Sequence, residues 1–349
     1  MFGNFNLDKT FHYLLIALAF LIPLTVFGAN LVIVALCIIW IISGSYKSKF
    51  TQIINNKFLL ASIIFFLVHV IGLLWTSDLN WGWHIAHKMW YFIGLLPILY
   101  TIVQKKNIRT YIYAFLLAIA LTEIISYMIW FELIEPIKNA IVENPTPFMS
   151  HISYNPILAF AIYLVLHEIF SNKELNNMVF LSYSFFAISM TINMFITGGR
   201  AGQVVFFVLI AILIFQLLEK ERVKSIFIVC LLIPGVFFTA YQSSSNFKDR
   251  VDTTINNTMQ YSDNKYTSVG YRFTYAINSW EIIKNNIFIG VGTGDYPSEY
   301  KKINQIRTPK IANTTNPHNM YVLVLSQLGL LGLVSMLSIF YYQIKIAYR

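Results

Sequence analysis

The sequence carries little charge. Only 12% of its 349 residues are Asp, Glu, Lys or Arg, whereas 57% are hydrophobic; soluble domains carry about 25% charged residues. This shortage excludes a disordered protein, a protein with an acidic tail and an ordinary soluble α/β enzyme. The apolar residues also come in long blocks, without the alternating faces of a single soluble core. The composition therefore predicts a polytopic membrane protein.

The sequence has only two cysteines, and they do not form a metal-binding pattern. Cys37 and Cys230 both lie in apolar runs, where neither can join an extracytoplasmic disulfide framework and neither has metal-ligand spacing. The segments predicted to face outward contain no Asp-x-Asp pair. No metal on a diphosphate is therefore indicated, although Asp249, Asp252 and Asp295 stay open as ligands. We expect no cofactor.

Ten apolar stretches are long enough to be read as transmembrane helices. A chain in lipid must satisfy its backbone hydrogen bonds within each segment, which makes these stretches helical. The stretches are 11–27, 30–46, 58–75, 89–103, 110–133, 155–170, 178–196, 201–218, 225–241 and 319–341. The expected fold is thus all-α: a polytopic bundle of about ten membrane helices with one large folded loop.

The basic residues predict the orientation of the bundle. If the N-terminus is cytoplasmic, thirteen Lys and Arg fall in inside segments, and only Lys88, Lys138 and Arg200 fall in short outside loops. Positive charges collect on the cytoplasmic side of membrane proteins, so both termini are expected there. The same rule accounts for the net charge of +9 without a nucleic-acid partner. Segment 242–318 then faces outward, into the periplasm of a Gram-negative cell.

The outward segment 242–318 is too long for a simple connection, because structureless loops beyond about 12–15 residues are uncommon. Helical apolar spacing runs through 271–286, a glycine-rich turn covers 290–295, and a second short helix is expected around 297–306. We therefore expect this segment to fold and to house the chemistry. The predicted parts are nine membrane helices in 1–241, the catalytic loop in 242–318, and a final membrane helix with a cytoplasmic tail in 319–349.

Two arginines are candidates for binding an anion. Arg200 lies between two spans in Thr-Gly-Gly-Arg-Ala-Gly. A charge near membrane depth costs roughly 2.5–3.5 kcal/mol unless an anion or water meets it. The alternative is an interfacial arginine that reaches lipid phosphate. Arg272 begins the amphipathic helix of the outward segment beside Tyr271 and Tyr275; its alternative is a surface arginine in an aromatic belt.

Two histidines on the predicted outer side are candidates for proton transfer. His318, in Asn-Pro-His-Asn, directly precedes the last span. An imidazole at a membrane boundary suits general base catalysis near neutral pH, although a lone interfacial histidine is more often structural. His151, before the sixth span, is explained more readily as a capping or packing residue.

The order of these elements resembles a known family. Gly-Gly-Arg-Ala-Gly (198–202) is followed by an Arg-led helix with a Trp, then by Asn-Asn-Ile-Phe-Ile-Gly-Val-Gly-Thr-Gly (285–294). Asn-Pro-His-Asn (316–319) comes next, before an apolar helix with Gly-Leu-Leu-Gly (329–332). This order resembles the O-antigen ligase and polymerase family of bacterial envelope glycosyltransferases, most specifically over 195–335.

The resemblance implies a reaction and a place for it. A glycan carried on undecaprenyl diphosphate would be moved to the lipid A–core oligosaccharide by a multi-pass protein of the inner membrane, with its active site facing the periplasm. The partners would be this donor, this acceptor and membrane lipids. Arg200 and Arg272 match the family's arginines and would bind the diphosphate without a metal. His318 matches its loop histidine and would act as the general base, in a transfer that inverts the anomeric centre.

Other activities stay open at this stage. The O-antigen polymerase joins lipid-linked repeat units to one another, and a third type of member transfers oligosaccharides to protein hydroxyls; one dominant outer loop favours the ligase. A transporter of the lipid-linked glycan would need charged residues in several spans and paired internal repeats. Only Glu123, Glu132 and Glu168 lie in the predicted spans, and no repeat is evident. Family members commonly continue with further spans, whereas this chain ends after one, which suggests a short member or a truncated form.

Overall fold

The computed structural model describes residues 6–138 and 140–347, and this part of the chain is 77% helical and contains no strands. The expected all-α fold is confirmed. The chain divides into two compact units, each assembled from segments that are distant in sequence. The first unit comprises Met1–Leu36 and Gln104–Thr254, and the second comprises Cys37–Val103 and Ile255–Arg349.

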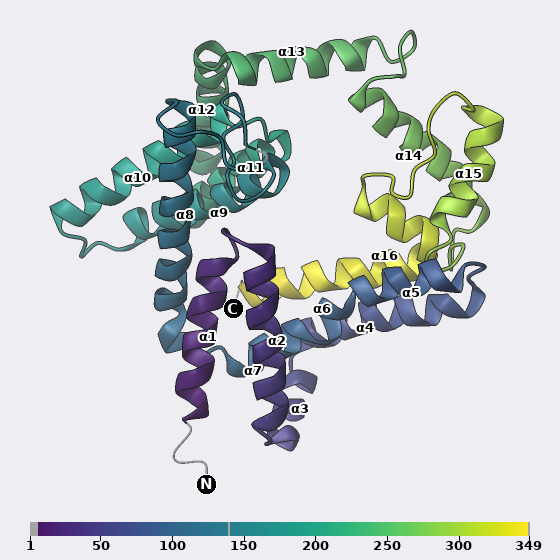
Figure 1. The fold of residues 1–349 in the computed structure, drawn as a ribbon, viewed down its shortest axis with the longest axis horizontal. Helices are drawn as coiled ribbons and strands as arrows, with labels where there is room; N and C mark the ends of the chain where they lie inside the picture. The colour runs from purple at the N-terminus through teal and green to yellow at the C-terminus, as the bar shows by residue number, and fades with distance from the viewer. Residues whose placement is uncertain (1–5, 139, 348–349) are drawn as a thin grey trace. The chain divides into compact units, whose positions relative to one another are not determined.

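The first unit is a helical bundle centred on α9. Here α1 lies beside α8, and α9 packs against α10 and α11 (Figure 1). The helices are α1 (Leu7–Leu21), η2 (Lys105–Asn107), α8 (Ile108–Trp130), α9 (His151–Ser171), α10 (Asn177–Ile196), α11 (Arg200–Leu217), α12 (Arg222–Ser243) and most of α13 (Ser245–Met259). The core between α9 and α10 includes the fully buried side chains of Tyr154, Leu158, Ile162, Met190 and Met194.

The second unit is built around α16 (Met320–Ala347), which runs along α4 and also contacts α14 and α15 (Figure 1). Phe65 of α4 and Val324 and Met336 of α16 form its main apolar core. The other helices are α3 (Tyr46–Ile54), α4 (Lys57–Ile71), η1 (Gly72–Trp75), α5 (Leu79–Lys88), α6 (Trp90–Ile93), α7 (Leu95–Ile102), α14 (Ser268–Asn285) and α15 (Tyr296–Arg307); α2 (Val26–Ile42) runs from one unit into the other.

Seven of the described helices are long and apolar enough to cross a membrane, or up to nine spans if two bent helix pairs each count as one. One bent pair is α2 with α3, at 116°, where Gly44 and Ser45 both have positive φ. The expected stretch 11–27 is not among these spans. It forms α1, whose 15 residues extend roughly 22 Å, short of the ~30 Å hydrocarbon core. Pro23, which lacks the amide hydrogen needed to continue a helix, follows it.

Both helices expected in segment 242–318 are present. The amphipathic stretch 271–286 lies in α14, and the short helix around 297–306 is α15, with Pro297 in its first turn. The sequence did not indicate α13, which continues almost directly from α12 after Ser244. These helices give the segment before α16 a folded structure that can position side chains.

Candidate functional site

His318 lies in an ordered turn that leaves its side chain exposed. Its φ of 58° is in the left-handed region, which costs a non-glycine residue on the order of 1–3 kcal/mol. Its N–H donates to Asn316 Oδ1 at 2.7 Å. Asn319 then caps α16, because its Oδ1 accepts hydrogen bonds from the N–H groups of Tyr321 and Val322. The Asn-Pro-His-Asn segment is therefore a helix start that fixes the backbone beneath an accessible imidazole.

An aromatic ladder joins His318 to the helix that carries Arg272. The His318 and Tyr275 ring centroids are 6.0 Å apart with planes at 26°, and Tyr275 stacks in turn on Tyr271 at 6.2 Å and 11°. Burial raises the pKa of Tyr275 above its ordinary value, so its phenol stays neutral at physiological pH. Arg272 is next to Tyr271 near the start of α14, with its side chain exposed. The structure therefore places His318 beside the helix turns from which Arg272 projects.

The glycine-rich segment 290–295 is a structural junction within the second unit. Gly290 and Gly329 both have positive φ, and a Cβ on either would overlap the backbone near the other. Gly329 interrupts the helical backbone of α16. The N–H of Val291 donates to Ser326 O at 3.0 Å, and the N–H of Leu330 donates to Ile287 O at 2.8 Å. The segment therefore satisfies backbone groups that the break in a membrane-spanning helix leaves open.

Asp295 closes this junction against the N-terminal end of α5. Its carboxylate is 4% exposed and accepts three hydrogen bonds, from Thr76 Oγ1 at 2.7 Å and from the N–H groups of Ser77 at 2.7 Å and Asp78 at 3.1 Å. All its partners are donors from one short segment. Asp295, which the sequence left open as a metal ligand, is thus committed to hydrogen bonds within the protein.

Arg200 is the first residue of α11 and is half-buried in the first unit. Its Nη1 donates to Thr254 Oγ1 at 2.6 Å, and Thr254 Oγ1 donates to the carbonyl of Arg250 one helical turn earlier. Gly199 and Gly202 flank it, and a Cβ on either would overlap Asn155 of α9. These glycines let α11 approach α9 closely, so the loop that presents Arg200 is held by helix packing.

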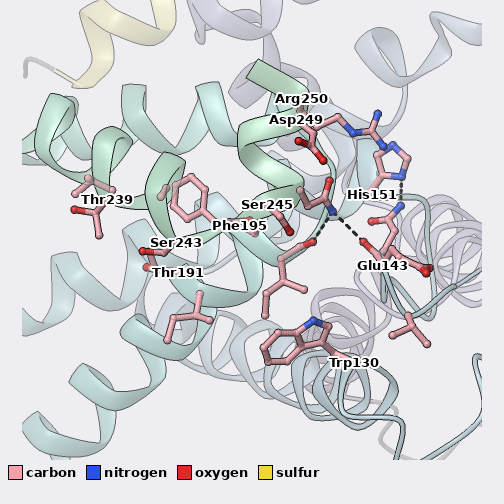
Figure 2. A pocket seen from close by; sticks show the side chains of 18 of the residues that line it. Trp130, Glu143, His151, Thr191, Phe195, Thr239, Ser243, Ser245, Asp249 and Arg250 are labelled. Carbon is pink, nitrogen blue, oxygen red and sulfur yellow. Dashed lines mark hydrogen bonds between the residues drawn. The ribbon is translucent and has the colours of Figure 1, made fainter. Parts of the chain in front are cut away.

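His151 begins α9 and belongs to the same loop network. Its Nδ1 lies 2.6 Å from Nδ2 of Asn144, as the dashed line in Figure 2 shows, and Asn144 Oδ1 accepts from the N–H of Gly198 at 3.2 Å. Asn155 accepts from Thr197 Oγ1 at 2.8 Å. His151 is therefore linked to the loop through Asn144, and it also lines a pocket.

The four predicted residues divide between the two units. Arg272 and His318 belong to the second unit, where the tyrosine ladder joins His318 to the helix that carries Arg272. Arg200 and His151 belong to the first unit, where Asn144 links His151 to Gly198 in the loop that carries Arg200. Sequence reasoning missed Asn144, Asn155 and the stacking role of Tyr275. Only Asn155 could have been noticed in the sequence, because it is a polar residue directly before Pro156. A proline inside a helix disturbs the backbone of the residue before it.

Within 6–138 and 140–347, no group of three or more His, Cys, Asp or Glu side chains is arranged to hold a metal ion. Asp252 accepts a hydrogen bond from the Tyr241 hydroxyl at 2.6 Å. In segment 242–318, hydrogen bonding to Lys284, aided by Arg307, lowers the pKa of Glu281. The ion pair of Glu281 with Arg307 joins α14 to α15, whereas its pair with Lys284 lies within α14.

Residues 185–337 match the family model described as O-antigen ligase. A comparison with curated proteins gives no match. The matched stretch begins within α10 and ends within α16, so it contains Arg200, Arg272, the glycine-rich junction and His318. With the apolar helices, the match supports membrane glycosyl transfer of the ligase or polymerase type. Over residues 185–337, the chain is therefore similar to the O-antigen ligase family.

Proposed function

We propose that this protein is an O-antigen ligase. It transfers a glycan from undecaprenyl diphosphate to a sugar hydroxyl of the lipid A–core oligosaccharide, at the periplasmic face of the bacterial inner membrane, and both of its termini are cytoplasmic. The observation that carries the proposal is the family match over 185–337 together with the exposed imidazole of His318 in a constrained turn within it. A constrained backbone beneath an accessible side chain is typical of functional sites.

The proposed chemistry is a direct displacement. The acceptor hydroxyl oxygen forms a bond to the anomeric carbon, and His318 takes the hydroxyl proton. The bond from that carbon to the diphosphate oxygen breaks, and the electron pair leaves with undecaprenyl diphosphate. Because attack and departure occur on opposite sides, the anomeric centre is inverted.

The two arginines serve the leaving group in this proposal. Guanidinium groups bind phosphate oxygens in pairs. The charge on the diphosphate grows as the glycosidic bond breaks, so contacts from Arg272 and Arg200 stabilise the transition state more than the ground state. Their exposed and half-buried side chains, each at the start of a helix, are compatible with contact to a bound substrate.

Deletion of the gene, followed by electrophoresis of lipopolysaccharide and of lipid-linked glycans, tests the proposal. Loss of a ligase leaves unmodified core while long polymer accumulates on the lipid carrier. Core that carries a single repeat would identify a polymerase instead, an activity that the same family match allows. Normal lipopolysaccharide with an unglycosylated envelope protein would replace both assignments by transfer to protein.

A further inference from the structure

A large pocket opens in the first unit, outside the residues assigned to catalysis. Its volume is about 1290 Å³. Most of its wall is apolar and comes from α10 and α12, both candidate membrane spans. The apolar side chains are Ile192, Phe195, Ile196, Leu232, Val236 and Ala240. A pocket with such walls fits a hydrocarbon chain.

One end of the pocket is polar and carries an uncommitted positive charge. Figure 2 shows Arg250 of α13 beside His151 at this end. Among the described residues, the Arg250 guanidinium makes no hydrogen bond or ion pair. Asp249 and Glu143 also line the pocket, but neither is within salt-bridge distance of Arg250. A guanidinium at the end of an apolar pocket is suited to the anionic head of an amphiphile.

The polar end is connected to the loop that carries Arg200. A Cβ added to Gly198 would lie 3.4 Å from Arg250 Nη2, so the guanidinium rests against this loop. Thr254 forms a second connection, because its hydroxyl accepts from Arg200 and donates to the Arg250 carbonyl. An anion bound at Arg250 would therefore lie close to a residue already proposed to bind the donor. This favours the donor's own lipid carrier over a phospholipid of the bulk membrane.

We propose that this pocket binds the lipid carrier of the glycan donor, with the isoprenoid chain along the α10–α12 wall and a phosphate at Arg250. The inference rests on the proposed function and adds a binding residue and a chain-binding site to it. Arg250 is a binding residue in this assignment, and His151 with Asn144 orders the loop around the phosphate.

Photo-crosslinking of the purified full chain tests the assignment without requiring transfer. The probe is a polyprenyl diphosphate with a diazirine in its chain and no glycan, presented in nanodiscs of neutral phosphatidylcholine. We expect labelled peptides from α10 and α12, and competition by undecaprenyl phosphate that phosphatidylglycerol does not reproduce. Equal competition by phosphatidylglycerol, or labelling confined to other helices, would overturn the assignment.

Two variants and a control sharpen this experiment. Arg250→Gln should weaken probe binding about tenfold, as expected for loss of a charge-assisted contact, and should raise the KM for the donor more than it lowers kcat. Gly235→Leu should block labelling, because Gly235 lines the pocket and a Cβ there meets only open space, so the added side chain occupies the pocket without disturbing the helix. Arg222→Gln, at the opposite end of α12 and exposed, should bind the probe as the wild type does.

The outcomes separate this inference from the proposed function. Specific labelling of the pocket by a protein with no glycan transfer would support the carrier site and reject the ligase. Transfer with an unchanged donor KM in Arg250→Gln, and unchanged labelling in Gly235→Leu, would reject the carrier site and leave the ligase intact.

Discussion

The imidazole of His318 stacks on the phenol ring of Tyr275, with ring centroids 6.0 Å apart and ring planes inclined by 26°. The two residues lie on different segments of the second unit, so the contact fixes a loop side chain against α14. Tyr275 is itself held by Tyr271 and by an edge contact with Tyr300 at 5.8 Å. This arrangement makes Tyr275 a positioning residue for the proposed base.

Tyr275→Ala should lower kcat for glycan transfer by about twofold to tenfold, since an aromatic pair contributes about 0.5–1.5 kcal/mol beyond its buried area. Tyr275→Phe keeps the ring and should restore most of the activity. A purely structural role would instead lower the melting temperature in step with activity in both variants. Trp280→Ala, an exposed aromatic on the same helix, serves as the control and should keep wild-type kcat.

His318→Ala and Arg272→Ala should each abolish measurable transfer, by at least about 100-fold, because one loses the proton acceptor and the other a contact to the developing diphosphate charge. The amount of membrane-inserted protein should not change, since both side chains are exposed. Arg272→Lys should recover only part of the activity, because an ammonium lacks the paired donors. The measurement is transfer by purified enzyme from lipid-linked donor to core acceptor.

Matched controls for these two substitutions come from the same unit. His87 is an exposed histidine of α5, and Arg307 is an arginine of α15 paired with Glu281. His87→Ala and Arg307→Gln should keep transfer within about threefold of wild type, as expected for surface changes. If purified His318→Ala were as active as His87→Ala, His318 would be removed from the mechanism.

The sequence alone predicted features that depend on local pattern. Apolar length identified most of the spans, and helical spacing located the helix that became α14. The contacts that organise the site join residues far apart in the chain, as when Asp295 accepts from Thr76 across 219 positions. No single-sequence pattern encodes such a pairing. The sequence did not single out Arg250 for a related reason. It is one of several basic residues in a long segment, and only the structure shows that it lines a pocket.

Asp295→Asn should lower thermal stability without a specific loss of chemistry. Asp295 is 4% exposed, and its carboxylate accepts three hydrogen bonds. In asparagine, the side-chain NH2 group would face at least one of these donors and could not accept its hydrogen bond. A cost of about 1–3 kcal/mol is expected for such a buried mismatch. Thermal unfolding in detergent provides the measurement, and the activity remaining per folded molecule should stay near wild type. Loss of activity at an unchanged melting temperature would show instead that Asp295 acts in the reaction.

Gly290→Ala and Gly329→Ala should each strongly destabilise the junction between α14 and α16. Both positions have positive φ, at 69° and 58°, and in each case the added Cβ would overlap backbone atoms, which cannot move aside as a flexible side chain can. The double variant should cost less than the sum of the single changes, because both disrupt the same junction. Yield after membrane extraction and the melting temperature are the readouts.

Gly44→Ala separates backbone strain from overlap in this comparison. Gly44 also has a positive φ, at 64°, but a Cβ there meets nothing within 4 Å. Its cost should therefore be only that of the left-handed conformation, on the order of 1 kcal/mol, with normal yield. Equal losses at Gly44, Gly290 and Gly329 would mean that conformation alone governs these positions. A loss confined to Gly290 and Gly329 would show that the close approach of the two backbones stabilises the broken last span and the turn holding His318 before it.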